Sequence, residues 1–396
     1  MTSATRNKIA EESAPRAPGA GFLKSFSSAE MAAPFDLFLA ALVTALIGFG
    51  VVMVYSASTV EATVRHHDPQ YFLLRHGLFA IAALAVMHAA SFFDYHHLYR
   101  LTYPLLVGVI VLLTLCVIGF GHSGGGATRW LAIGPIHIQP AEPAKLALVI
   151  WLAYSLSKKA EQVKSFKIGF LPHLIVAGFL VALCMKQPDF GSAVVLVFLT
   201  FTLLFVAGAK IGYILGASIV GLALAFAAIR FRAYRYERFL AWLNIEQNRF
   251  GSGYQPYQAV MSFGSGELTG LGLGQGLQTL YLPGAHTDFI AATIGEELGF
   301  IGIVVLCAAY LMLVVRGVRI ALRSSDDFGA YLAFGISTLF AVQVLMNLAV
   351  ALAVVPTKGL TLPFISFGGS SLLVNAAAAG ILLNISRQPA AREVMS

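Results

Sequence analysis

Long apolar runs recur along most of this 396-residue chain, and they restrict its fold more than any other feature of the sequence. Each run is roughly 20 residues long, which is the length that an α-helix needs to cross the hydrocarbon core of a bilayer. Charged residues make up only 11% of the chain, whereas soluble domains carry roughly 25%. The residue-by-residue alternation of a membrane β-barrel is absent. The sequence therefore predicts an all-α integral membrane protein.

We predict about ten membrane-spanning helices on this length criterion. The ten segments are 37–57, 71–92, 101–120, 141–157, 168–186, 190–208, 211–230, 287–315, 329–355 and 363–385. Basic residues are concentrated in the cytoplasmic loops of membrane proteins. If the N-terminus is cytoplasmic, nearly every inner segment of this chain is short and basic. We therefore predict that both termini lie in the cytoplasm.

One polytopic membrane domain, 35–386, is expected to be flanked by two tails. Residues 1–34 are rich in Ala, Ser, Pro and charge and lack the apolar core of a signal peptide, which predicts a disordered cytoplasmic tail. Residues 387–396 form the expected cytoplasmic C-terminal tail. Basic loops explain the net charge of +7, and no platform of aromatic and basic residues points to nucleic acid. The three cysteines lie inside apolar runs, without the spacing of a metal site or a disulfide framework.

The segment 231–286 is predicted to be a long extracytoplasmic loop between helices 7 and 8, yet it is rich in arginine. The arginines in and beside it are Arg230, Arg232, Arg235, Arg238 and Arg249. A long loop can be translocated despite its charge, and arginine matches phosphate oxygens in bidentate fashion. The cluster indicates an anionic ligand on the outer face or contact with lipid headgroups. Six glycines between 264 and 276 fit either a flexible, partly re-entrant lid or an ordinary surface loop.

With this topology, a set of charged and polar side chains falls on the outer side of the membrane. Its members are Arg129, Glu142, Lys145, Lys186, Asp189, Arg235, His286, Asp288 and Lys358. A transport pathway would place such charge near the midplane of the bilayer. The convergence on one side therefore predicts an active site at the membrane surface.

Simpler roles are open to several of these residues. Glu142 and Lys145 are three residues apart and could form an ion pair on a helix surface. Asp189 could cap the N-terminus of the sixth helix. Arg129 and Lys358 could anchor their loops at the membrane interface.

Asp288 is the strongest candidate for chemistry. It begins an apolar helix directly after the arginine-rich loop, and ionisable groups at a membrane boundary are costly and usually functional. A helix cap is its simpler role, but a cap needs neither the adjacent His286 nor a basic loop. Glu296 would lie roughly 12 Å further along the helix, and Glu297 on nearly the opposite face. We interpret both as structural polar groups, with Arg75 as a potential partner for one of them.

Motifs between 126 and 371 together resemble the SEDS family of bacterial membrane glycosyltransferases, the group of FtsW, RodA and SpoVE. These motifs are Arg129-Trp130-Leu131, Gln139-Pro-Ala-Glu142-Pro-Ala-Lys145, Lys186-Gln-Pro-Asp189-Phe-Gly191, Gly253-Tyr254-Gln255, Gly272-Leu-Gly274, His286-Thr-Asp288-Phe-Ile290, Ile294-Gly-Glu-Glu-Leu-Gly299, Pro356-Thr-Lys358-Gly-Leu-Thr-Leu-Pro363 and Ser366-Phe-Gly-Gly-Ser370-Ser371. The motif around Lys358 is more similar to the division-type members (FtsW) than to the elongation-type members (RodA). Ala141 and Phe367 depart from the residues common in the family, and neither is needed for the chemistry.

The resemblance implies that the substrate is lipid II, a disaccharide-pentapeptide on undecaprenyl pyrophosphate. It implies polymerisation into glycan strands during septal cell-wall synthesis, in the cytoplasmic (inner) membrane of a bacterium. The implied partners are a class B penicillin-binding protein, which is a transpeptidase, and other membrane proteins of the divisome. Ser370, in the last motif, joins the expected substrate-binding residues.

A single inverting displacement fits this reaction, because the donor sugar is α-linked to pyrophosphate and the product is β-linked. We expect Asp288 to act as the general base toward the acceptor hydroxyl. Arg129, Lys145 and Lys358, with the loop arginines, would stabilise the leaving pyrophosphate. A divalent cation, Mg²⁺ or Mn²⁺, could share that role. The sequence offers no multi-carboxylate cage, so the substrate phosphates would hold most of such an ion.

Two other functions fit some of the same features. A flippase for lipid II would also need cations for the pyrophosphate, but it would distribute charge through the depth of the bilayer. A division scaffold that activates the transpeptidase would need no base at all. The outer segments of helices 8 and 9 are plausible docking surfaces by the same resemblance.

Overall fold

The computed structural model describes residues 35–388 except 125–126, 135, 232 and 358. The predicted N-terminal tail, most of the C-terminal tail and Lys358 thus lie outside the described residues. The helices are α2 (Leu37–His66), α3 (Tyr71–Phe92), α4 (His96–Leu115), α5 (Ala141–Lys158), α6 (Leu171–Lys186), α7 (Phe190–Val206), α8 (Ile211–Arg230), α9 (Ala233–Leu243), α10 (Tyr254–Ser265), α11 (Ile290–Arg323), α12 (Asp327–Ala351) and α13 (Gly369–Ser386). Short π-helical turns extend α4 at Cys116–Phe120 and precede α6 at Phe166–Phe170.

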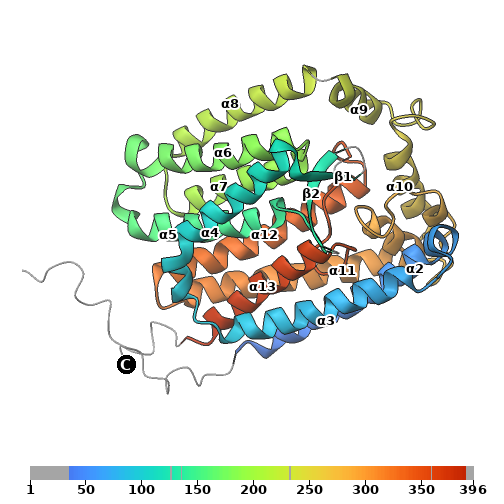
Figure 1. Ribbon diagram of the computed structural model, residues 1–396, viewed down its shortest axis with the longest axis horizontal. Coiled ribbons are helices and arrows are strands. Elements are labelled where there is room, and N and C mark those ends of the chain that lie inside the picture. The colour runs from blue at the N-terminus through green and yellow to red at the C-terminus, as the bar shows by residue number, and fades with distance from the viewer. Residues whose placement is uncertain (1–34, 125–126, 135, 232, 358, 389–396) are drawn as a thin grey trace, which may run out of the picture. The chain divides into compact units, whose positions relative to one another are not determined.

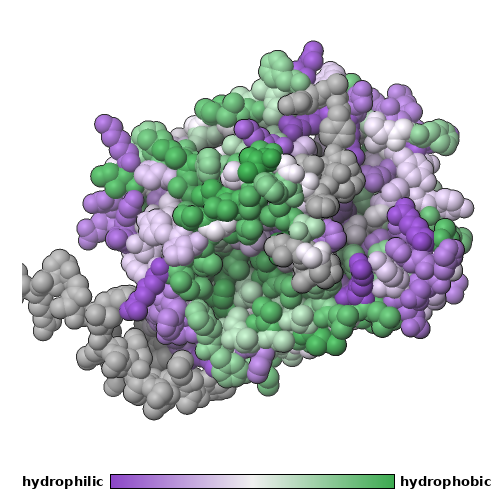
Figure 2. Space-filling model, in the orientation of Figure 1, coloured by the Kyte–Doolittle hydropathy of each residue, from purple (hydrophilic) through white to green (hydrophobic). Residues whose placement is uncertain are grey.

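Eight helices in the described part of the chain are long and apolar enough to cross a membrane. The 17-residue α7 is apolar but shorter, and the 18-residue α5 carries charged residues near its start. Together these ten helices correspond to the ten predicted segments. Figure 2 shows apolar side chains across the middle of one face and hydrophilic side chains toward its two ends. The prediction of an all-α membrane protein is confirmed, and the cytoplasmic placement of the termini stays a prediction.

The first and last described helices meet at the same end of the bundle. The backbone N–H of Asp36 donates to Ser386 Oγ at 3.0 Å, and the guanidinium of Arg387 lies 5.2 Å from the ring centre of Phe35. Asp36 also caps α2, because its side chain accepts from the N–H of Leu39. Chain ends that meet in this way agree with an even number of crossings.

Helix α12 lies at the centre of the bundle and packs against α5, α7, α11 and α13. Its core side chains, among them Leu332, Ile336 and Phe340, are fully buried. Helix α8 is the opposite case, since none of its residues is buried. It lies along the edge of the bundle, beyond α6 and α7 (Figure 1).

A small antiparallel sheet precedes α5, where the sequence indicates only a loop. Its strands are β1 (Gly121–Gly124), β2 (Ala127–Ile133) and β3 (Ile136–Ile138), in the order β1-β2-β3. Strands of three to seven residues leave too little alternation to be recognised in a sequence. The sheet matters for function because β2 carries Arg129.

The described residues of the predicted outer loop, 231–286, include regular secondary structure. The loop contains α9, α10 and a 3₁₀ turn at Gln278–Leu280. Its segment 267–272 inserts beside a break in α11, where Gly299 has φ 66° and ψ −166°. A Cβ at Gly299 would lie 2.4 Å from the nitrogen of Gly270, so only glycine fits.

The inserted segment supplies the hydrogen bonds that the break removes from α11. The bonds run from Phe300 N to Glu267 O (2.9 Å), from Ile301 N to Leu268 O (3.1 Å), from Leu271 N to Glu296 O (3.0 Å) and from Gly272 N to Glu297 O (2.9 Å). Backbone groups without partners are very costly in a lipid environment. The loop is therefore part of the membrane domain's structure.

The carboxylates of Glu296 and Glu297 also hold this loop. Glu296 accepts from the N–H of Gln278 at 2.7 Å and from Thr279, and Glu297 accepts from Ser56 Oγ on α2 at 2.7 Å. Their interpretation as structural polar groups is confirmed. The suggested pairing with Arg75 is wrong, because that guanidinium lies 4.8 Å from the ring centre of Tyr71 instead.

Candidate functional site

Asp288 lies in the turn before α11 and does not cap that helix. The N-cap position is Phe289, which makes no side-chain capping bond. The side chain of Asp288 is half-buried. Its carboxylate is therefore available for another purpose, as the sequence predicted.

The carboxylate of Asp288 and the guanidinium of Arg129 both lie close to the backbone of Gly359, on the side where a Cβ would be. A Cβ added to Gly359 would be 2.8 Å from Asp288 Oδ2 and 3.5 Å from Arg129 Nη1. Any side chain at 359 would thus displace the carboxylate. No local pattern singles out this glycine within its motif, because the two residues that crowd it, Asp288 and Arg129, are distant in the sequence. They are separated from it by 71 and 230 positions.

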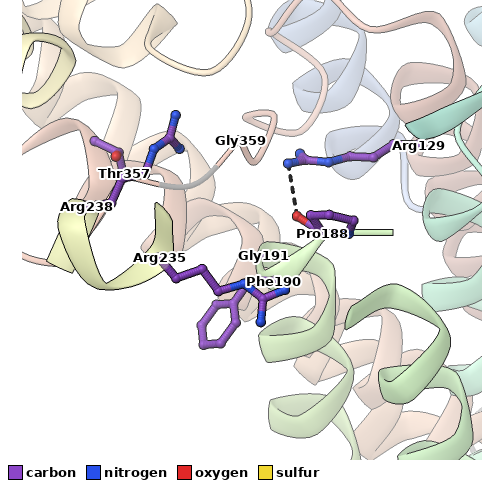
Figure 3. A pocket seen from close by; sticks show the side chains of 8 residues that line it. All are labelled: Arg129, Pro188, Phe190, Gly191, Arg235, Arg238, Thr357 and Gly359. Carbon is purple, nitrogen blue, oxygen red and sulfur yellow. Dashed lines mark hydrogen bonds between the residues drawn. The ribbon is translucent and has the colours of Figure 1, made fainter. Parts of the chain in front are cut away.

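Three arginines and Gly359 line a small pocket (Figure 3). The lining residues are Arg129, Pro188, Phe190, Gly191, Arg235, Arg238, Thr357 and Gly359. Arg129 Nη2 donates to the carbonyl of Pro188 at 3.0 Å, which directs the guanidinium into the pocket rather than toward lipid. Sequence-distant elements, β2 and α9, thus bring together two of the predicted residues, Arg129 and Arg235, with Arg238.

Arg235 is fixed by the ends of two helices. Its guanidinium donates to the carbonyl of Ala228 near the end of α8 at 3.2 Å and to that of Met185 in the last turn of α6 at 3.3 Å. Cations near helix C-termini interact favourably with the helix dipole. Helix α9 is also attached to the end of α12, because Trp242 Nε1 donates to the carbonyl of Ala353 at 2.8 Å. Two of the three arginines of the pocket, Arg129 and Arg235, are therefore held in position by main-chain carbonyls.

The pKa of Asp288 is raised to about 6, mainly because burial disfavours the charged carboxylate. The nearby guanidinium of Arg129 opposes this by lowering the pKa, and the carboxylate of Asp189 raises it further. A carboxylate with this pKa is largely ionised near neutral pH and is more basic than an ordinary aspartate. Such a value suits a general base.

Glu142 and Lys145 form an ion pair inside the protein. Lys145 Nζ lies 2.7 Å from Glu142 Oε1, and the two side chains are only 1% and 4% exposed. The ion pair that the three-residue spacing suggested is therefore present. It is buried inside the protein, however, and does not lie on a helix surface. Neither residue lines the arginine pocket, so any contact of Lys145 with substrate would require this pair to open.

Removing one partner of the pair is expected to destabilise the protein. A buried charge without its partner costs about 3–5 kcal/mol. Lys145→Met or Glu142→Gln should therefore lower the unfolding temperature in detergent, and the double variant should recover much of the loss. A double variant that unfolds at the temperature expected from adding the two single losses would contradict this account.

Asp189 caps α7, the simpler role that its position suggested. Its carboxylate accepts from Ser192 N at 3.0 Å and Ser192 Oγ at 2.8 Å, and also from Gln139 Nε2 at 3.2 Å. Its neighbours Pro188 and Phe190 line the pocket. Asp189 thus holds the chain segment that lines the pocket. Its own carboxylate oxygens are occupied by hydrogen bonds from Ser192 and Gln139.

Ser370 and Lys186 lie near the site without lining the pocket. Ser370 Oγ donates to the carbonyl of His137 at 3.0 Å and accepts from Gln139 N at 3.2 Å, which fastens α13 to β3. Lys186 is exposed at the end of α6. Their substrate-binding roles stay predictions.

His286 faces α2 and α3 rather than the pocket. It is buried, its Nδ1 is 3.4 Å from Glu61 Oε2, and its ring is 4.7 Å from that of Phe72. Burial lowers the pKa of His286, an effect that Glu61 opposes and Arg65 reinforces. This placement fits a residue that orients the turn carrying Asp288.

Comparison with known proteins identifies relatives over nearly the whole chain. Residues 37–391 match the family FTSW_RODA_SPOVE, described as "Cell cycle protein". A protein of Geobacter metallireducens named "Probable peptidoglycan glycosyltransferase FtsW" is 46% identical over 354 residues, which cover 89% of this chain and 94% of the relative.

Solved structures give the same result. A chain from "Structural coordination of polymerization and crosslinking by a peptidoglycan synthase complex" is 29% identical, with a TM-score of 0.73 and coverage of 89% of this chain and 98% of that one. The rod shape determining protein RodA of Thermus thermophilus is 30% identical, with a TM-score of 0.67 and coverage of 89% and 97%.

Proposed function

The chain belongs to the FtsW, RodA and SpoVE family, and we propose that it polymerises lipid II with Asp288 as the general base. It is a multi-pass membrane protein and a peptidoglycan glycosyltransferase of the FtsW type. One observation carries the chemical assignment: the half-buried carboxylate of Asp288 and the guanidinium of Arg129 both lie close to Gly359. Arg129 and Gly359 also line the pocket that contains two further arginines. The reaction needs one base and one anion-stabilising pocket, and this arrangement can supply both.

The proposed step is a single inverting displacement. The 4-hydroxyl oxygen of the acceptor sugar attacks C1 of the donor, and its proton passes to the carboxylate of Asp288. The bond between C1 and the pyrophosphate oxygen breaks, and the undecaprenyl pyrophosphate leaves with the electron pair. No covalent intermediate with the protein is required.

The arginine pocket would receive the leaving pyrophosphate. Negative charge develops on the departing oxygen in the transition state, and cations fixed in advance stabilise that charge. Arg129 and Arg235 are each held by backbone carbonyls, so little reorganisation is needed when the charge develops. The planar guanidinium also matches phosphate oxygens better than an ammonium group does.

A divalent cation, Mg²⁺ or Mn²⁺, fits this site only as an ion shared with the substrate. Among the described residues, no group of three or more His, Cys, Asp or Glu side chains could hold a metal ion. The phosphates of the substrate and water would therefore supply most of the coordination. Such an ion would neutralise charge on the pyrophosphate.

Polymerisation is expected to lose activity in acid as Asp288 becomes protonated. Because its pKa is about 6, kcat/KM should fall about tenfold per pH unit below that value and level off above it. Arg129 and Asp189 are the charged groups acting on this carboxylate. The measurement is the initial rate of glycan synthesis from purified lipid II between pH 5 and 8, at roughly constant ionic strength.

His286→Gln is the matched control for the pH profile. It removes the neighbouring group that could also titrate, and the acid limb should remain. If the limb disappears in this variant, His286 rather than Asp288 controls it.

One structural relative belongs to a peptidoglycan synthase complex that coordinates polymerisation with crosslinking. This supports a transpeptidase of the class B penicillin-binding type as the partner, together with other divisome proteins. We place the protein in the bacterial inner membrane, at the division septum. Polymerisation assays should therefore include the partner, and a partner variant that binds without increasing the rate would separate assembly from activation.

A further inference from the structure

Three consecutive backbone carbonyls around Asp288 are each held by a donor from another part of the chain. The carbonyl of His286 accepts from Phe367 N at 2.9 Å, and that of Thr287 accepts from Ser366 Oγ at 2.6 Å. The carbonyl of Asp288 itself accepts from Asn347 Nδ2 at 2.9 Å. A turn in which every carbonyl is bonded cannot rotate a peptide plane without losing a bond. The backbone from which the Asp288 side chain projects is therefore held in place.

Asn347 makes a second bond that links this turn to the pocket. Its Nδ2 also donates to the carbonyl of Leu360 at 2.6 Å, next in the chain to Gly359. Asn347 is fully buried on α12. One amide group thus joins the two segments that face each other at the candidate site.

We propose that Asn347 is a positioning residue that sets the distance between Asp288 and the Gly359 backbone. It acts through these two segments and does not touch the substrate. The inference rests on the proposed role of Asp288 as the base. The physical reason is the narrow tolerance of the reaction: a misplacement of about 1 Å can cost about 100-fold in rate.

The crowding at Gly359 makes this distance critical. With Asp288 Oδ2 already 2.8 Å from the place of a Cβ on Gly359, a small shift of either segment changes where the carboxylate points. The amide of Asn347 supplies two N–H groups, and an apolar side chain supplies none. An aspartate in its place would turn one carboxylate oxygen toward both carbonyls, which is repulsive.

The experiment compares Asn347→Leu and Asn347→Asp with a matched control, Asn384→Leu. Asn384 is a buried asparagine of α13 at the other end of the bundle. Its Nδ2 donates to the carbonyl of Ser91 at 3.0 Å, and its Oδ1 accepts from Tyr95 N at 3.0 Å. Its replacement therefore also removes two hydrogen bonds, far from Asp288.

Both Asn347 variants are expected to lower kcat on the order of 10- to 100-fold, with KM for lipid II changed by less than about twofold. Asn384→Leu should lower the unfolding temperature but leave kcat within about twofold of the wild-type value. Hydrogen exchange measured by mass spectrometry provides a readout without catalysis. Peptides covering 284–290 and 357–362 should exchange faster in the Asn347 variants only.

Several results would overturn the inference. Wild-type kcat in either folded Asn347 variant would do so, as would a loss of kcat in Asn384→Leu that matches the loss in Asn347→Leu. Unchanged exchange at 284–290 would also do so. Failure of the proposed function would give a different result, because Asp288→Asn would then remain active. The hydrogen-exchange measurement would still test the link through Asn347 in that case.

Discussion

Asp288→Asn is expected to stop glycan polymerisation from lipid II, with a loss of about 10²- to 10⁴-fold, the usual contribution of a positioned general base. Asparagine has nearly the same shape and can still occupy the turn before α11, but it cannot accept the proton of the acceptor hydroxyl. The three hydrogen bonds that hold this turn involve main-chain carbonyls. They are expected to survive the substitution.

The same variant should be at least as stable as the wild-type protein at neutral pH. Burial raises the pKa of Asp288 from 3.8 to about 6, so the folded protein binds this proton more tightly than the unfolded chain does. The stability from this group is present in acid and is lost as the pH rises through about 6. Asparagine removes the cost of the buried charge at pH 7. An inactive variant with an unchanged or higher unfolding temperature therefore separates chemistry from folding.

The measurement is the rate of glycan synthesis by purified protein with its partner, beside an Asp68→Asn control. Asp68 is an exposed carboxylate in the turn between α2 and α3, and its replacement should leave the rate unchanged. A wild-type rate in Asp288→Asn would remove the base assignment. Lipid II movement without glycan product in the wild-type protein would instead favour a flippase, and division supported by inactive Asp288→Asn would favour a scaffold.

Much of the fold could be predicted because bilayer thickness sets the length of each apolar run. Ten segments became ten helices for this reason. The sheet carrying Arg129 and the break at Gly299 could not be predicted. Both depend on backbone bonds between distant residues, which leave no local pattern.

The charged residues of the candidate site could be predicted from the sequence. The uncharged residues that position them could not. Asp288 and Arg129 stand out because charge is rare in an apolar chain. Gly359 and Asn347 do not stand out, since their roles arise only where two distant segments meet. The same limit explains the error at Arg75, whose partner proved to be the neighbouring Tyr71 ring.

Arg129→Ala is expected to lower the rate of polymerisation by about 10²- to 10³-fold, as loss of one fixed group for the developing charge typically does. It should also move the acid limb of the pH profile upward, because Arg129 lowers the pKa of Asp288. Only a residue close to both the leaving group and the base would produce the two effects together.

Arg129→Lys and Arg249→Ala complete this test. Lysine keeps the positive charge but has no planar guanidinium group. It cannot donate to the Pro188 carbonyl and at the same time offer further N–H groups in a plane to a phosphate. We therefore expect only partial activity. Arg249 is an exposed arginine of the same outer loop, stacked on Phe250 at 4.9 Å, and its loss should leave both rate and pH profile unchanged. Equal losses in Arg129→Ala and Arg249→Ala would mean that the arginines act through general attraction to anionic lipid. A loss confined to Arg129, with the acid limb shifted, would tie the guanidinium to the same reaction centre as Asp288.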